Sequence, residues 1–136
     1  MSVRLIALWD GWATPANEAE LWHFMARDYN LVDVVLIPNY GEAYQDIRQA
    51  DSIQVEIDKA RSDGFTVIGL DENETAELSD YTHPVNAAYV FGRGSRNPDI
   101  DVDVVIRIAT PLTGGLLWGH QAAAIALYDR ERKSWL

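Results

Sequence analysis

Three histidines, His23, His83 and His120, are the side chains of this sequence best suited to move a proton near neutral pH. Their spacing matches neither HxxxH nor HExxH, and the sequence has no cysteine, so we expect no metal site. No GxSxG motif is present to support a serine nucleophile. His120 directly follows Gly119 within an expected helix, where it can be either a half-buried structural imidazole or a catalytic base.

Two glycine-rich segments, residues 92–95 and 113–115, each follow an expected strand. Neither completes a GxxxxGK[ST] or GxGxxG phosphate-binding motif, and each alone is typical of a turn. Their positions still matter, because ligands of parallel α/β sheets bind beyond the carboxyl ends of the strands. The second segment also precedes a helix, whose free N–H groups can bind an anion or a carboxylate.

Apolar runs alternate with helical patterns along the whole sequence. Strands are expected at residues 4–9, 32–38, 65–70, 87–91 and 102–108. Helices are expected from Thr14-Pro15 to about residue 30, over residues 42–63, and from about residue 115 to residue 132. This alternation predicts one α/β domain over residues 1–136, with a mostly parallel sheet and helices on both faces. Any ligand is then expected beyond Leu70, Phe91 and Ile108.

Composition narrows the choice of partners. The 136 residues include 11 basic and 21 acidic side chains, for a net charge of −10, and 48% are hydrophobic. Such a charge argues against a broad phosphate-binding surface, so DNA is not expected, and RNA binding needs a local basic patch or a helper protein. The sequence has no apolar run of about 18 residues, so no membrane-spanning segment is expected. The lack of cysteine fits a cytoplasmic protein.

Three segments taken together resemble the SpoU/TrmH-type branch of the SPOUT superfamily of RNA methyltransferases. Residues 8–11, followed by residues 15–17, are similar to the opening strand and the PxN turn of that branch. Residues 88–92 are similar to its strand that ends in a glycine at the cofactor pocket. Residues 106–128 are similar to its "IPM…SLN…AAAIALYE" ending, which is the most specific of the three. The resemblance spans residues 4–130.

This resemblance implies a deep trefoil knot near the C-terminus, a homodimer, and S-adenosylmethionine held largely through backbone groups. The implied cofactor-binding positions are Leu70, Gly92, Ile108 and Leu116. Arg93 and Arg96, which lie beside the pocket glycine, are expected to hold RNA phosphate.

The implied catalytic positions are kept only in part. Asn17 matches the asparagine of the PxN turn, but His23 stands where the branch has an arginine. Gly94 replaces a glutamate, and Trp118 replaces the asparagine of the SLN motif. Methyl transfer to a hydroxyl requires that the hydroxyl be placed in line and lose its proton. Asn17, His23 and His120 are therefore the candidate catalytic residues, with either histidine as the base.

Three interpretations follow. The first is an S-adenosylmethionine-dependent methyltransferase of tRNA or rRNA, with a ribose 2′-hydroxyl as one acceptor. The second is a non-catalytic dimeric binding or regulatory protein that keeps the cofactor pocket or only the scaffold. The third is an unrelated small α/β protein in which Gly92 and Gly115 are merely turns. Retention of the pocket-forming segments favours the first interpretation, while the acidity and the replaced catalytic residues favour the second.

Overall fold

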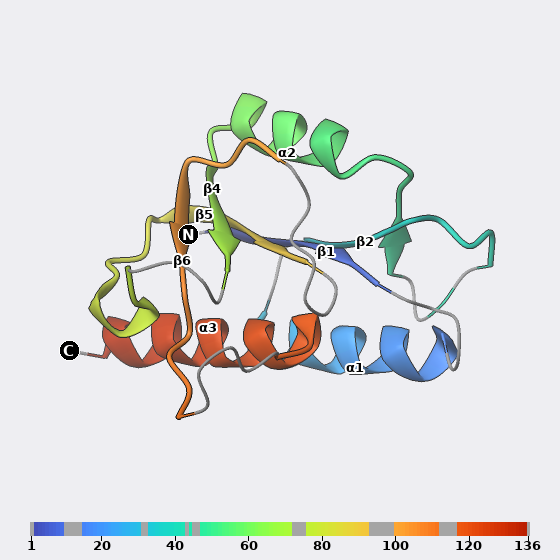
Figure 1. The fold of residues 1–136 in the computed structure, drawn as a ribbon. Coiled ribbons are helices and arrows are strands. Elements are labelled where there is room, and N and C mark those ends of the chain that lie inside the picture. Colours follow the sequence, from blue (N-terminus) through green and yellow to red (C-terminus); the bar gives the residue numbers. More distant parts are fainter. Residues whose placement is uncertain are drawn as a thin grey trace.

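A six-stranded sheet forms the centre of the molecule, and every neighbouring pair of its strands runs parallel (Figure 1). The computed structural model describes residues 2–9, 15–30, 33–42, 44, 47–71, 76–92, 100–111 and 117–135. The strands are β1 (Ser2–Leu8), β2 (Asp33–Ile37), β3 (Arg48–Gln49), β4 (Thr66–Leu70), β5 (Asn86–Phe91) and β6 (Val104–Ile106), in the spatial order β3-β2-β1-β5-β4-β6. The helices are α1 (Pro15–Asp28), α2 (Ile53–Ser62) and α3 (Gly119–Ser134), with a short 3₁₀ helix, η1, at Leu78–Asp80.

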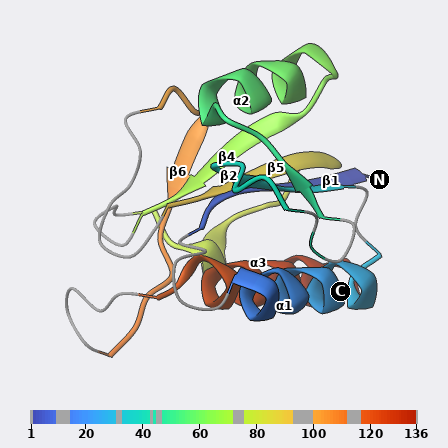
Figure 2. The ribbon, with the colours of Figure 1, turned by 90° about the vertical axis from the view of Figure 1, so that its right-hand side faces the viewer.

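Helices cover both faces of this sheet: α2 lies on one face, and α1 and α3 lie side by side on the other (Figures 1 and 2). Alternate side chains of β5 divide between the two resulting cores. Tyr89 and Phe91 belong to the core beneath α1 and α3, whereas Ala88 and Val90 belong to the core beneath α2. Because both faces are buried, the strand has no charged or amide side chain from Ala87 to Phe91. The predicted α/β fold with a parallel sheet and helices on both faces is confirmed.

The helix expected over residues 42–63 was wrong in its first half. The structure forms β3 at Arg48–Gln49, and α2 begins only at Ile53. Ser52 marks this start, since its hydroxyl oxygen accepts a hydrogen bond from the Val55 N–H at 3.3 Å. Upstream of the cap, the backbone extends along the exposed edge of β2, and the Ala50 N–H donates to the Leu36 carbonyl at 3.0 Å. Pairing with that sheet edge outweighs the local helical pattern.

The last helix begins at Gly119, about four residues later than expected, and ends at Ser134. Trp118 is its N-cap and has an extended backbone, and its N–H donates to the side-chain oxygen of Gln121 at 2.9 Å.

Strand β6 is also shorter than the expected 102–108. At Arg107 the chain no longer pairs with β4 and instead forms an isolated β-bridge with Glu77.

The knot implied by the resemblance remains a prediction. In the described part of the chain, no helix is both long and apolar enough to cross a membrane.

A buried polar cluster fastens the second half of α3 to the segment that enters β5. The His83 ring contacts the Tyr89 hydroxyl at 2.6 Å through Nδ1 and an Asp129 carboxylate oxygen at 2.8 Å through Nε2. That carboxylate oxygen also lies 2.6 Å from the Lys133 ammonium group. Arg130 donates to the Tyr89 hydroxyl and to two backbone carbonyls just before β5. With the proton on Nε2, His83 donates to Asp129 and accepts from Tyr89, so a neutral ring satisfies both partners.

We predict that His83 makes the stability of this fold depend on pH. Burial lowers the pKa of His83 below 6.5, and Lys133 and Arg130 lower it further, against the opposing effect of Asp129. The unfolded chain therefore takes up a proton first on acidification. The stabilisation from the neutral ring is present above pH 6.5 and is lost as the pH falls towards the lower folded-state pKa.

Urea unfolding of wild type and His83→Gln, from neutral to mildly acidic pH, measures this effect. At neutral pH we expect the variant to be less stable by about 1–3 kcal/mol, because Tyr89 and Asp129 lose a buried partner. The difference in free energy of unfolding between wild type and His83→Gln should become smaller as the pH falls. A difference that stays constant across the pH range would contradict the assignment of this titration to His83.

Candidate functional site

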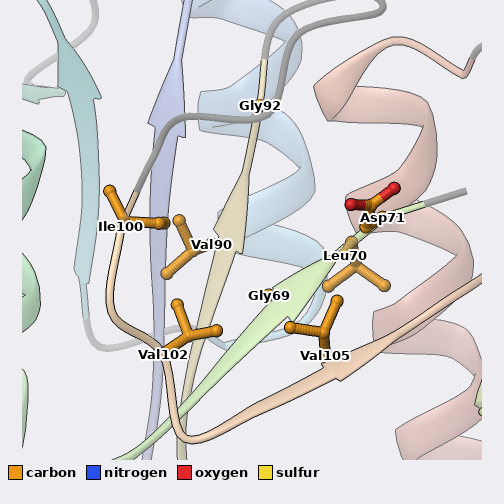
Figure 3. A pocket seen from close by; sticks show the side chains of 8 residues that line it. All are labelled: Gly69, Leu70, Asp71, Val90, Gly92, Ile100, Val102 and Val105. Carbon is orange, nitrogen blue, oxygen red and sulfur yellow. The ribbon is translucent and has the colours of Figure 1, made fainter. Parts of the chain in front are cut away.

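The carboxyl ends of β4 and β5 border a pocket of about 170 Å³ (Figure 3). Parallel pairing brings these ends to one edge of the sheet, which is where α/β folds bind ligands. The pocket walls are mostly aliphatic, and they combine the strand ends with the segment that leads into β6. They consist of Gly69, Leu70, Asp71, Val90, Gly92, Ile100, Val102 and Val105.

The segment before β6 forms the outer wall and is held over β4 by Asp103. One carboxylate oxygen of Asp103 accepts from the Val67 N–H at 2.7 Å, and the other accepts from the Arg61 guanidinium at 3.1 Å. The Asp103 N–H in turn donates to the Val67 carbonyl at 2.9 Å. Gly69 also favours this close approach, since a Cβ atom there would lie 3.2 Å from a methyl group of Val102, a tight contact. The outer wall of the pocket is therefore held in place by specific contacts within the fold.

Two of the four predicted cofactor positions, Leu70 and Gly92, meet in this pocket. Ile108 is instead half-buried and packs against the core beneath α1 and α3. Leu116 lies outside the described residues, as do Arg93 and Arg96, the predicted phosphate-binding residues. Asp71, the residue directly after β4, also lines the pocket.

The first residue of α3 lies against the end of β5. A Cβ atom on Gly119 would be 3.4 Å from the Gly92 carbonyl oxygen, 3.5 Å from the Cβ atom of Phe91 and 3.5 Å from Cζ2 of Trp22. At Gly119, the start of α3 therefore lies close to the pocket glycine Gly92 and to the buried Trp22 of α1. Residues from three distant parts of the sequence meet at this point.

Two buried polar atoms at this junction lack a hydrogen-bond partner within the described structure: Nε1 of Trp22 and Nδ1 of His120. Burial lowers the pKa of His120, so its imidazole is neutral at pH 7 and able to accept a proton. An unpaired buried polar atom is costly unless a water or a ligand satisfies it. His120 therefore carries a buried ring nitrogen that no described protein group satisfies.

The other two candidate catalytic residues lie on α1. Asn17 is exposed in its first turn, and His23 is partly exposed one residue beyond the buried Trp22. The His23 ring contacts Phe24, with 5.4 Å between the ring centroids. Because Trp22 contacts Gly119, the segments carrying His23 and His120 belong to neighbouring elements.

Several residues of this site escaped sequence reasoning. Ile100, Val102 and Val105 line the outer wall of the pocket. The only sequence signal for them was their position before or within an expected strand.

Among the described residues, no group of three or more His, Asp and Glu side chains could hold a metal ion.

Positive charge in the described part of the chain is largely neutralised. Of the nine Lys and Arg residues there, at least eight form ion pairs or hydrogen bonds with protein groups. Arg48, for example, pairs with both Asp33 and Glu56. Phosphate binding by these residues would have to compete with carboxylates already in place.

Comparison with known proteins connects this geometry to one group of solved structures. An RNA 2′-O ribose methyltransferase superposes with a TM-score of 0.77 at 15% identity, over 99% of this chain and 57% of that protein. A second solved structure, from a study of the 2-OH methylation of C/U34 on tRNA, superposes with a TM-score of 0.74 at 17% identity. The match covers 98% of this chain and 97% of that one.

The SpoU methyltransferase AviRb from Streptomyces viridochromogenes, in complex with AdoMet, gives a TM-score of 0.71 at 15% identity, over 98% of this chain and 58% of AviRb. This chain thus has the fold of SpoU-type RNA methyltransferases and spans little more than half the length of two of these three. No family model matches the sequence, and no curated protein matches it.

We predict that Asp103 is needed to hold the outer wall of the pocket. Asp103→Ala leaves the Val67 N–H without its carboxylate partner and should lower the free energy of unfolding by about 1–3 kcal/mol. Asp101→Ala is the matched control, because its side chain is 87% exposed. The control should stay within about 0.5 kcal/mol of wild type. Equal urea midpoints for the two variants would refute the role of Asp103.

Proposed function

We propose that this chain is an S-adenosylmethionine-dependent RNA methyltransferase of the SPOUT class, with a ribose 2′-hydroxyl of tRNA or rRNA as its acceptor. The observation that carries the proposal is the pocket in which Leu70 and Gly92 meet at the carboxyl ends of β4 and β5. The sequence resemblance assigns both positions to the cofactor. Structures with this fold include an RNA 2′-O ribose methyltransferase and an AdoMet complex, which supports the same assignment.

The described walls suit part of such a cofactor. Their aliphatic side chains and the backbone at Gly92 fit a flat, mostly apolar group such as an adenine ring. The volume of about 170 Å³ is below the roughly 300–1,000 Å³ of typical ligand sites, so these walls hold only a portion of the molecule. Following the resemblance, we assign Ile108 and Leu116 to the rest of the binding site. S-adenosylmethionine supplies an electrophilic methyl group when bound.

The chain must then orient a hydroxyl group and take its proton. The bound cofactor would be the methyl donor, and residues of this chain would place the ribose hydroxyl in line with the methyl group and accept the hydroxyl proton. His120 fits the role of base, because it is neutral at pH 7 and its Nδ1 is unpaired within the described structure. His23 is the second candidate, and Asn17 is proposed to position the hydroxyl.

RNA binding is proposed to use Arg93 and Arg96, with a helper protein supplying further positive charge. The net charge of −10 and the pairing of nearly all described Lys and Arg residues motivate the helper.

We further propose a homodimer and, from the resemblance, the trefoil-knotted chain path. Helices α1 and α3 carry exposed apolar side chains, which suits contact with a second copy. These side chains are Leu21, Phe24, Ile125 and Tyr128.

A second candidate function is a binding or regulatory protein that keeps the pocket without the reaction. The replacement of the family's arginine by His23 and of its asparagine by Trp118 favours it. Saturable cofactor binding without methyl transfer to any RNA would select this alternative.

We predict that the protein binds one S-adenosylmethionine, or one S-adenosylhomocysteine, per subunit in calorimetric titration. Gly92→Trp places a large side chain in the pocket and should abolish this binding. Light scattering should still report a dimer and circular dichroism a folded chain. Wild-type affinity in the variant would remove Gly92 from the site, and no wild-type binding at millimolar ligand would overturn the cofactor assignment.

We also predict that one histidine carries the proton transfer. With labelled cofactor and unmodified tRNA or rRNA transcripts, His120→Ala should lower the rate of methyl transfer at least about tenfold. If His23 is the base, His23→Ala shows that loss in its place. Cofactor affinity should stay unchanged in the affected variant, which separates catalysis from binding. Full rates in both variants would exclude both residues.

A further inference from the structure

We propose that Tyr40 is a nucleobase-stacking residue of this protein, positioned to hold a base of the RNA whose ribose is methylated. The inference rests on the proposed function and extends it to a residue outside the three motif segments that carry the resemblance. Tyr40 follows β2, and β2 runs parallel to β1 and β5. Its segment therefore leaves the same edge of the sheet as the pocket.

The distance along this edge suits one RNA strand. In the sheet order, β1 alone separates β2 from β5, the strand that ends at Gly92. Neighbouring strands lie 4.7–4.9 Å apart, so the ends of β2 and β5 are separated by about 10 Å. A nucleotide adjacent to one at the pocket can reach the segment that carries Tyr40.

The Tyr40 ring is exposed yet firmly supported. The residue is 41% exposed, and the centroid of its ring lies 5.2 Å from that of Trp9, at an interplanar angle of 63°. Trp9 is fully buried at the end of β1, and its Nε1 donates to the Pro38 carbonyl at 2.8 Å. The ring therefore rests against a fixed part of the core.

Hydrogen bonds fix Tyr40 at both of its ends. The Tyr40 hydroxyl donates to the Trp9 carbonyl at 3.3 Å, and the Tyr40 N–H donates to the side-chain oxygen of Gln49 at 2.8 Å. The preceding Asn39 accepts from the Gly41 N–H at 2.8 Å, which shapes the turn. A ring held in this way loses little conformational freedom when a base stacks on it.

Stacking also fits the charge of this protein. Base stacking on an aromatic side chain needs no net charge on either partner, and it tolerates any base because each has a π face. A chain whose described cations are nearly all paired can gain RNA affinity in this way. The part of the RNA affinity that comes from Tyr40 should then not depend on salt, because stacking releases no counterions.

The test compares four proteins, wild type, Tyr40→Phe, Tyr40→Leu and Tyr40→Ala, in the presence of S-adenosylhomocysteine. Each is titrated with an unmodified RNA transcript and with a short RNA that carries a fluorescent purine analogue. Tyr40→Leu and Tyr40→Ala should weaken RNA binding by about 5- to 150-fold, and Tyr40→Phe should stay within about twofold of wild type. Fluorescence quenching of the analogue, which reports stacking, should survive only in wild type and Tyr40→Phe.

Affinity for S-adenosylhomocysteine should be the same in all four proteins. Wild-type RNA affinity in Tyr40→Leu would overturn the stacking role while leaving the proposed function in place. Equal losses in Tyr40→Phe and Tyr40→Ala would assign the effect to the hydroxyl group and also overturn stacking. If wild type binds neither cofactor nor RNA, the proposed function and this inference both fail.

Discussion

Strand β5 is the element on which the rest of this structure depends, because it is buried on both faces and paired on both edges. Five of its six residues are buried, and it pairs with β1 on one side and with β4 on the other. In such a place each backbone N–H and C=O must bond to a neighbouring strand, so the register is fixed. Tyr89 anchors the polar cluster below α3, and Phe91 and Gly92 meet the first residue of that helix.

Much of the architecture could be predicted from the sequence, because it depends on apolar runs that report burial locally. The runs ending at Leu70 and Phe91 predicted β4 and β5, and the order of strands and helices predicted the parallel sheet. The start of α2 was misplaced, although Ser52 offered a usable cap. The competing interaction there is the free edge of β2, which no local pattern reveals.

The site could be predicted only where the chain itself carries the signal. Leu70 and Gly92 end predicted strands, so their meeting in one pocket follows from parallel pairing. The outer wall could not be found in this way, because Asp103 holds it through Val67, which lies 36 positions away in the sequence. His83 and Asp129 are separated by 46 positions. The support of Tyr40 by Trp9 likewise appears only once the ends of β1 and β2 are side by side.

Helix α3 is attached to β5 near both of its ends. Gly119 lies against Gly92 at one end, and towards the other end Arg130 binds Tyr89 and the carbonyls before β5. The helix and the strand together therefore make a closed frame, in which neither can tilt without the other. Tilting α3 away from β5 would have to break the contact at Gly119 or the hydrogen bonds of Arg130, so the end of β5 that borders the pocket is held from both sides.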